Sequence, residues 1–207
     1  MSAARESRSA FYMLVPPRVG GRFARGYQRG TWINEVLCGE CGLAQSELVP
    51  PLLVEWDAAI GQVLGDFTWS CSTMISEACS QRMKTELGLQ FRTEPVKTVK
   101  ERVHKQPPPS NPEQGGLLWL RGAYVGKMAD CELGQSAQQR CRVCGKRTNT
   151  VLVGEMLVRQ DRAFEFGLFE VPEHGGGTSL FAAEAVADRL RRAGFSNLAL
   201  QRAGDLV

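Results

Sequence analysis

Two identical cysteine motifs give this chain of 207 residues its clearest chemical signal. They are Cys38-Gly-Glu-Cys41-Gly and Cys141-Arg-Val-Cys144-Gly. Two residues between cysteines let both sulfurs turn toward one point, and the following glycine tolerates the positive φ that such a turn often needs. Four thiolates in a tetrahedron are a preferred structural environment of Zn²⁺. The motifs therefore predict one structural Zn²⁺ site with the ligands Cys38, Cys41, Cys141 and Cys144.

The distance between the motifs is unusual, because residues 42–140 separate them, whereas common zinc ribbons have far shorter insertions. Lengthening a closed loop from about 12 to about 100 residues adds roughly 2 kcal/mol of closure entropy. Structural zinc contributes on the order of 10–16 kcal/mol in small finger peptides. The long spacing is therefore compatible with one shared metal ion.

Three other interpretations of the motifs remain open. A thioredoxin-type redox pair needs a helix that begins at the motif, and the residues after Gly42 do not open a clear helix. A disulfide within each motif would follow oxidation, although no secretory signal places the chain in an oxidising compartment. Separate or intermolecular metal sites would use the same four cysteines in another arrangement.

The remaining cysteines and the two histidines have simpler expected roles. Cys71 and Cys79 fall on core-facing patterns, and Cys131 is expected to be a small buried apolar residue. His104 lies in a charged segment before a proline run, and His174 precedes a glycine run. We expect both histidines to be solvated loop residues.

No sequence feature supports catalysis. The chain has no Gly-rich phosphate loop, no HExxH and no GxSxG motif. A metal held by four cysteines has no open coordination position for a catalytic water. The neighbouring carboxylates Glu55, Asp57 and Asp66 are expected to cap elements or face solvent. The sequence therefore predicts a protein that is not an enzyme.

Composition indicates a globular protein in the cytoplasm. Apolar residues make up 43% and charged residues 23%, and no apolar run approaches the roughly 18 residues of a membrane span. We therefore expect no membrane insertion. The net charge of +3 does not by itself indicate nucleic acid, and the arginine-rich residues 1–31 are expected to form a solvated arm.

Hydrophobic periodicity predicts an α+β fold with a mixed sheet and a few short helices. Helices are predicted over residues 52–64, from the N-cap Ser76 to Gly88, and over residues 182–193 before Gly194. Strands are predicted over residues 10–15, 67–75, 89–91, 117–125, 151–158, 164–171 and 198–200. The two CxxCG motifs would add a pair of zinc-ribbon-like knuckles.

The chain is predicted to be a single domain, 1–207, with two similar halves as an alternative. These halves would be 1–106 and 117–207, joined by the Pro/Gly-rich loop 107–116. In each half, a CxxCG motif precedes a strand, a helix and a glycine at the helix end. A duplication of this kind would place the two knuckles in equivalent, facing positions.

The sequence resembles the double-CXXCG paralogous family of myxobacteria. Besides the paired motifs, the resemblance rests on Phe11-Tyr-Met-Leu14 and on the apolar approach Trp32–Leu37. Further landmarks are Gly65-Asp-Phe-Thr-Trp69, Phe195-Ser-Asn-Leu198 and the downstream Gly204. The landmarks extend over most of the chain with little similarity between them. Gly39 stands where the family usually has a proline, which affects the turn and not the ligands.

This resemblance implies an immunity protein. The family includes immunity proteins of the swarming-inhibition system, which protect a producing cell from a lipoprotein toxin, so the implied partner is a cognate protein toxin. The mixed-charge segment Arg92–Lys105 and the acidic segment Glu165–Glu173 are candidate binding surfaces. The alternative is a zinc-ribbon nucleic-acid-binding or regulatory protein, because basic residues that could meet phosphates surround the second motif. These residues are Arg140, Arg142, Lys146 and Arg147.

Overall fold

The computed structural model describes the residues in the ranges 8–18, 23, 25–28, 32–40, 44–57, 62–70, 72–98, 115–129, 141–143, 156–171 and 179–207. The first strands are β1 (Ser9–Val15), β2 (Arg25–Gln28), β3 (Trp32–Leu37), β4 (Ala44–Leu48), β5 (Leu52–Asp57), β6 (Phe67–Trp69) and β7 (Thr73–Ser76). The later strands are β8 (Phe91–Thr98), β9 (Leu117–Gly122), β10 (Tyr124–Val125), β11 (Met156–Val158), β12 (Leu168–Glu170), β13 (Leu180–Ala183) and β14 (Ala199–Leu206). The helices are α1 (Glu77–Thr85), α2 (Glu184–Ala193) and the 3₁₀ turn η1 (Arg162–Glu165).

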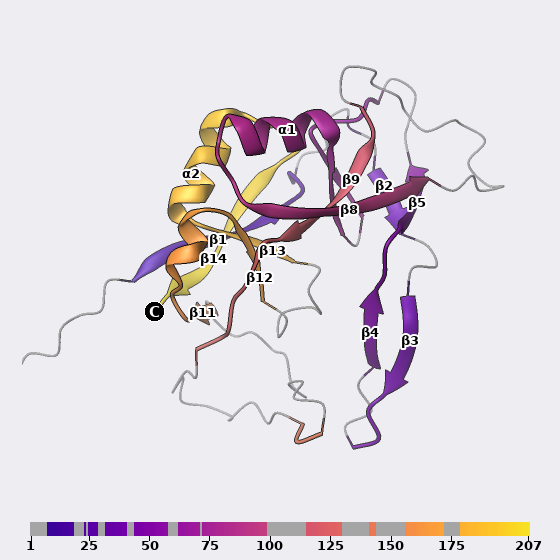
Figure 1. Cartoon of the computed structure of the whole chain (residues 1–207), viewed down its shortest axis with the longest axis vertical. Coiled ribbons are helices and arrows are strands. Elements are labelled where there is room, and N and C mark those ends of the chain that lie inside the picture. Colours follow the sequence, from indigo (N-terminus) through magenta and orange to yellow (C-terminus); the bar gives the residue numbers. More distant parts are fainter. Residues whose placement is uncertain are drawn as a thin grey trace, which may run out of the picture.

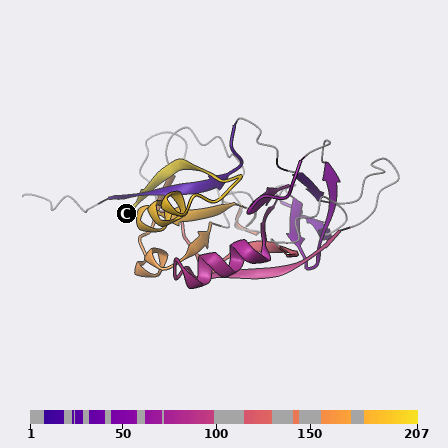
Figure 2. The same ribbon diagram turned by 90° about the horizontal axis from the view of Figure 1, so that it is seen from above.

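The described strands form two six-stranded sheets and a two-stranded ribbon (Figure 1). Sheet 1 has the order β10-β12-β13-β1-β14-β11, and sheet 2 has the order β2-β5-β8-β9-β7-β6. Both sheets are mixed, because β10 and β11 in sheet 1, and β5 in sheet 2, pair in parallel with a neighbour. Strands β3 and β4 pair only with each other within this part of the chain and form the ribbon. The two sheets lie side by side when seen from above (Figure 2).

An apolar core joins the two sheets. Phe67 and Ile75 of sheet 2 belong to the same buried cluster as Leu168 and Ala182 of sheet 1. Both helices bury one face in this cluster. Each sheet also has a separate core of its own, which contains Phe169 and Phe181 in sheet 1 and Val54 and Trp119 in sheet 2.

Local sequence signals mark the start of α1 and the ends of both α-helices. Ser76 is the N-cap of α1, where its hydroxyl accepts a hydrogen bond from the backbone N–H of Cys79 at 3.0 Å. Gly88 follows α1 with φ 60°, and Gly194 caps α2 with φ 64°. Glycine adopts this left-handed conformation without the steric cost that a Cβ imposes. These features confirm the predicted helix from Ser76 to Gly88.

The predicted helix over residues 52–64 is wrong, because the chain forms β5 there. Leu52 and Val54 are fully buried, and they alternate with the half-buried Leu53. β5 obtains its backbone hydrogen bonds from β2 on one side and β8 on the other. Pairing with two distant strands therefore overrides the helix-like spacing of the local apolar residues.

Other predicted elements have different bounds in the structure. The strand predicted over residues 67–75 is two antiparallel strands, β6 and β7, and the Ser70 backbone N–H donates to the Ser72 carbonyl between them. The helix predicted to begin at Ala182 begins two residues later, because Ala182 is fully buried in β13. The strand predicted over residues 164–171 is η1 followed by β12. Of the strand predicted over residues 151–158, only 156–158 fall within the described residues, and they form β11.

The two mixed sheets and two α-helices confirm the α+β class. The predicted halves do not coincide with the sheets, because β1 is a central strand of sheet 1 and β9 is a central strand of sheet 2. Each predicted half therefore supplies a strand to the other sheet. No helix of the described residues is long and apolar enough to cross a membrane.

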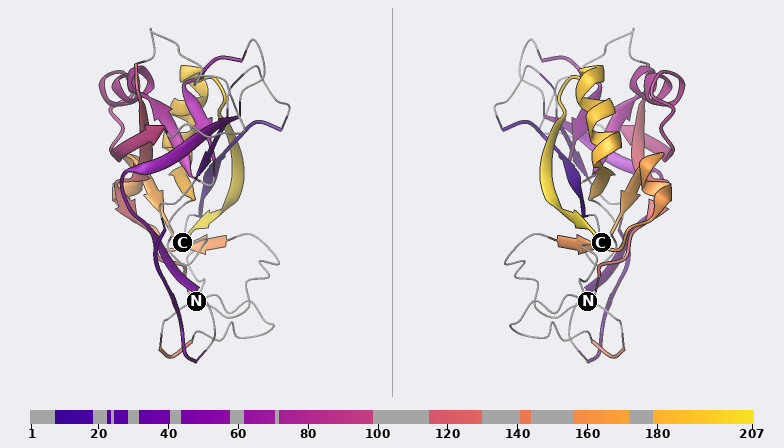
Figure 3. Two further views of the ribbon diagram at one scale, coloured as in Figure 1. Left: turned by 90° about the vertical axis from the view of Figure 1, so that its right-hand side faces the viewer. Right: turned by 90° about the vertical axis from the view of Figure 1, so that its left-hand side faces the viewer.

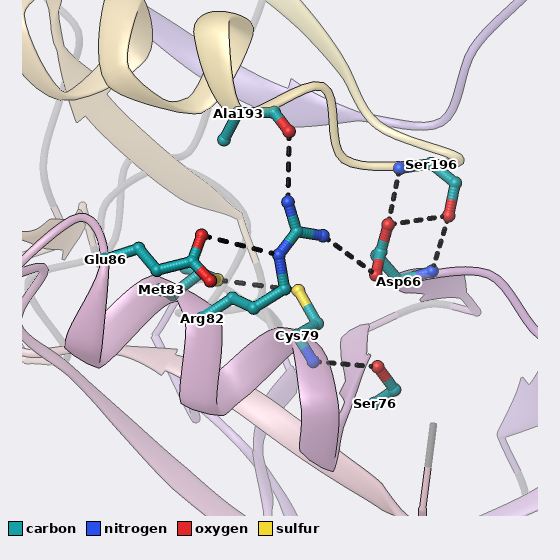
Figure 4. A network of polar contacts seen from close by, with 8 residues as sticks. All are labelled: Asp66, Ser76, Cys79, Arg82, Met83, Glu86, Ala193 and Ser196. Carbon is teal, nitrogen blue, oxygen red and sulfur yellow. Dashed lines mark hydrogen bonds and ion pairs between the residues drawn. The ribbon is translucent and has the colours of Figure 1, made fainter. Parts of the chain in front are cut away.

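Polar contacts join α1, the start of β6 and the end of α2 (Figure 4). The Asp66 carboxylate accepts hydrogen bonds from the Ser196 backbone N–H at 2.7 Å and from the Ser196 hydroxyl at 2.8 Å. Arg82 donates a hydrogen bond to the Ala193 carbonyl at 3.1 Å, and its Nη1 lies 3.7 Å from Oδ1 of Asp66. Its guanidinium also stacks on the Phe195 ring. These contacts fix the end of α2 against sheet 2.

The shared core predicts the cost of truncating either helix. Met83 of α1 and Leu190 of α2 are buried in the same cluster, so Met83→Ala and Leu190→Ala should each lower the free energy of unfolding by about 2–5 kcal/mol. Urea denaturation measures this loss. The exposed Lys84→Ala is the control and should change the free energy by less than about 0.5 kcal/mol. Losses below about 1 kcal/mol at both buried positions would contradict a shared core.

Candidate metal centre

The first CxxCG motif begins where β3 ends. Leu37 pairs with Ala44, so residues 38–43 connect the two strands of the ribbon. The tip of the ribbon lies at the end of the molecule opposite α1 and α2 (Figures 1 and 3). The ribbon therefore carries Cys38 away from the shared core.

The second motif approaches this tip from a distant part of the chain. Residues 141–143 lie beside residues 38–40 at the same end of the molecule (Figure 3). The Cys38 and Cys141 sulfurs are 3.6 Å apart, although 103 positions separate the two residues in sequence. Both side chains are buried, with exposed fractions of 6% and 7%. The fold thus brings together one predicted ligand from each motif.

The distance between these sulfurs fits a tetrahedral thiolate site. Sulfurs that lie about 2.3 Å from a tetrahedral Zn²⁺ are about 3.8 Å from one another. A disulfide would need an S–S distance of about 2.05 Å. The observed 3.6 Å is a contact distance for two thiols and lies within about 0.2 Å of the spacing that zinc requires. The donor set also fits, because zinc binds thiolate sulfur strongly.

Glu40 is a neighbour that the sequence analysis did not single out. Its side chain extends from the first motif toward the second, and its Oε2 lies 3.5 Å from the Cys141 sulfur. The thiol can donate its proton to this carboxylate. A charged residue inside a CxxC motif is the sequence signal that could have drawn attention to it.

Several predicted residues lie outside the described part of the chain. They include the ligands Cys41 and Cys144, the cysteines Cys71 and Cys131, both histidines, and the basic residues Arg140, Lys146 and Arg147. Among the described residues, no group of three or more His, Cys, Asp or Glu side chains could hold a metal ion. The structure therefore describes the Cys38–Cys141 pair, and the complete ligand set stays a prediction.

Cys79 has a structural role, as its core-facing pattern predicts. Its side chain is fully buried in the shared core, 3.8 Å from the Met83 sulfur. Burial raises the pKa of the Cys79 thiol far above its ordinary value of 9.0. The nearby Asp66 carboxylate also raises it, and Arg82 lowers it. Cys79 is therefore a protonated thiol in the neutral range and an inert packing residue.

Comparison with known proteins gives no relative: no family profile matches the chain, and no curated protein matches it.

The raised pKa of Cys79 predicts a loss of stability at alkaline pH. The folded protein keeps the thiol proton above pH 9.0, whereas the unfolded chain releases it. The stabilising contribution of the Cys79 thiol to the free energy of unfolding is therefore complete below this pH. It falls by up to about 1.4 kcal/mol for each pH unit above it. Cys79→Val should flatten this part of the curve, as urea denaturation between pH 7 and pH 10.5 would measure. Parallel curves for the two proteins would contradict the prediction.

Proposed function

We propose that this protein is a zinc-stabilised, non-catalytic immunity protein that binds and neutralises a cognate protein toxin. The observation that carries the zinc part is the 3.6 Å separation of the Cys38 and Cys141 sulfurs. The toxin-binding part rests on the resemblance to the double-CXXCG family, and the proposed zinc site is compatible with it.

The proposed ligands are Cys38, Cys41, Cys141 and Cys144, and the chemistry of the metal would be structural. Zinc held by four thiolates crosslinks the chain and has no open position for substrate. The crosslink would tie the tip of the β3–β4 ribbon to the segment that precedes β11. Because β3 and β4 pair only with each other among the described strands, such a tie would restrict the motion of the ribbon.

Neutralisation of a toxin by binding requires a specific surface. Some charged residues of the candidate segments Arg92–Lys105 and Glu165–Glu173 are not available to a toxin, because they already have partners inside the fold. Glu170 is buried and accepts hydrogen bonds from Arg121 and from the Gly122 backbone N–H. Glu165 and Phe166, in contrast, are exposed at the end of η1. In this region we therefore assign partner contact to Glu165 and Phe166 and not to Glu170.

Nucleic-acid binding is the alternative function. Arg142 is exposed directly beside Cys141, where it could meet a phosphate. Basic residues beside a zinc site of four thiolates also offset its charge of −2, so this position serves either function. A DNA affinity that falls steeply with salt concentration would support the alternative.

The shared zinc site predicts one zinc ion per chain. Protein purified under reducing conditions should carry one equivalent, and Cys38→Ser or Cys141→Ser should each abolish stoichiometric binding, as metal analysis by mass spectrometry would show. Removal of zinc should also lower the free energy of unfolding. The loss is about 4 kcal/mol relative to protein in a free zinc concentration of 1,000 times the Kd.

The matched control is Cys79→Val, which removes a cysteine from the core and should keep the full zinc equivalent. Circular dichroism of each variant separates loss of metal from loss of fold. Wild-type protein without zinc, or a Cys38→Ser or Cys141→Ser variant with a full equivalent, would show that the shared site is wrong.

The immunity function predicts a toxic partner encoded beside this gene. Expression of the neighbouring gene alone should stop growth, and co-expression of this chain should restore it. The two proteins should then co-purify as a complex. Phe166→Asp should weaken the complex at least tenfold if this exposed residue lies in the interface, whereas the exposed Lys84→Asp on α1 should not.

Normal growth of cells that express the neighbouring gene alone would contradict the immunity function. Restored growth on co-expression without a complex of the two proteins would also contradict it. If the complex forms but Phe166→Asp binds as well as wild type, only the assignment of the surface is wrong. These outcomes are independent of the zinc measurement.

A further inference from the structure

The two sheets contain the same arrangement of strands. This similarity is independent of the proposed zinc site. We call β5, β6, β7, α1, β8 and β9 unit N, and β11, β12, β13, α2, β14 and β1 unit C. The strand order is β5-β8-β9-β7-β6 in unit N and β11-β14-β1-β13-β12 in unit C. In both units the first pair is parallel and the other three pairs are antiparallel.

The registers of the central strands also agree. In unit N, Leu118 of β9 lies between Ile75 of β7 and Pro95 of β8. In unit C, Tyr12 of β1 occupies the corresponding place between β13 and β14. Each pairing partner of Tyr12 lies 107 positions after the equivalent partner of Leu118. These partners are Ala182 of β13 and Arg202 of β14. A single offset therefore relates two different strand pairings in each unit.

The helices follow the same offset of 107. The residues that α1 buries correspond one by one to those that α2 buries. The pairs are Cys79 with Val186, Ser80 with Ala187, and Met83 with Leu190. The strand before each helix, β7 or β13, keeps the same offset at both ends. The match thus extends from backbone pairing to side-chain burial.

Contacts between the units are reciprocal. Arg82 of α1 donates to the carbonyl of Ala193 at the end of α2, at 3.1 Å. Arg189, which is 107 positions after Arg82, donates to the carbonyl of Leu87 beyond the end of α1, at 3.0 Å. The two acceptors differ by one position, because Ala193 corresponds to Glu86, but each arginine donates to the end of the other helix. Such reciprocal contacts are a property of a two-fold symmetric interface.

Backbone contacts repeat this reciprocity. The first residue of β6, Phe67, donates its N–H to the carbonyl of Ser196 after α2, at 3.3 Å. The first residue of β12, Leu168, donates its N–H to the carbonyl of Gln90 after α1, at 3.0 Å. Each unit therefore receives the loop that follows the helix of the other unit.

We infer that the chain is an internal duplication, in which unit N and unit C are two copies of one fold related by an approximate two-fold axis. The strand β1 is the last strand of unit C, which the N-terminus of the chain supplies. The equivalent strand of unit N, β9, follows β8 directly along the sequence. The chain is thus a fused pseudo-dimer that differs from two copies in tandem by the position of one strand.

The duplication also relates the two CxxCG motifs. Leu53 of β5 pairs with Lys97, and Met156 of β11 pairs with Gly204, which is 107 positions later, so Leu53 and Met156 are equivalent. Cys38 and Cys141 each lie 15 positions before these residues. The two sulfurs that approach each other are therefore equivalent residues of the two copies. A metal held there would lie between the units, although the duplication itself does not depend on metal.

A circular permutant of the full chain tests this inference. Ser9 pairs with Leu206, so the two ends of the described chain are neighbours, and joining Val207 to Met1 leaves residues 1–8 as a connection between β14 and β1. Opening this chain between Gln106 and Pro107 makes β9 the first strand and places β1 directly after β14. The permutant then has the element order of the native chain with the two units exchanged.

We expect this permutant to keep the far-ultraviolet circular dichroism of the native chain and a single urea transition with a similar midpoint. The control has the same joint and is opened between Leu87 and Gly88, inside unit N, and it should lose the cooperative transition. A second permutant, opened between Gly20 and Gly21, tests the joint alone and should fold.

The inference is overturned if the permutant opened at 106/107 lacks a cooperative transition, whether or not the joint alone is tolerated. The inference is also overturned if the control opened at 87/88 is as stable as the permutant opened at 106/107. An opening inside unit N would then be tolerated as well as one between the proposed units. These readouts need no metal, so a failed zinc measurement would leave the test of the duplication intact.

Discussion

The apolar core between the two sheets is the constraint on which the rest of the structure depends. Residues from both sheets and from both helices bury their side chains in it, so neither sheet has a complete inner face without the other. Burial of this kind is the main favourable contribution to folding. The polar contacts of Asp66 and Arg82 then fix how the end of α2 meets sheet 2. The cysteine pair lies far from this core, and its position follows from how the core places the two sheets.

This arrangement explains how two motifs 103 positions apart can meet. Closing a flexible loop of that length costs roughly 2 kcal/mol more than closing a loop of about 12 residues. Here unit N, which lies between the motifs in sequence, is itself folded, so only the ribbon and the segment before β11 remain to be placed. If the units are copies of one fold, equivalent positions on opposite sides of an approximate two-fold axis meet whenever they lie near that axis. The approach of Cys38 to Cys141 is then a consequence of symmetry.

The cysteines of the chain differ in chemistry because their surroundings differ. Cys79 is enclosed by apolar side chains, and its proton is held by the cost of burying a thiolate. Cys38 and Cys141 are also buried, but each has another thiol as a neighbour, and Glu40 lies beside Cys141. A buried thiol next to a second thiol can share a metal, whereas a buried thiol among methyl and methylene groups can only pack.

The sequence by itself determined the features that depend on near neighbours. The spacing within each CxxCG motif, the N-cap at Ser76 and the glycine after each helix could all be predicted, because each acts over a few residues. The tertiary structure alone decided that Leu52–Asp57 is a strand, that β1 joins sheet 1, and that Cys38 meets Cys141. Each of these depends on partners that are distant in sequence. Local periodicity contains no information about such partners, since they are selected by burial and backbone pairing in the folded chain.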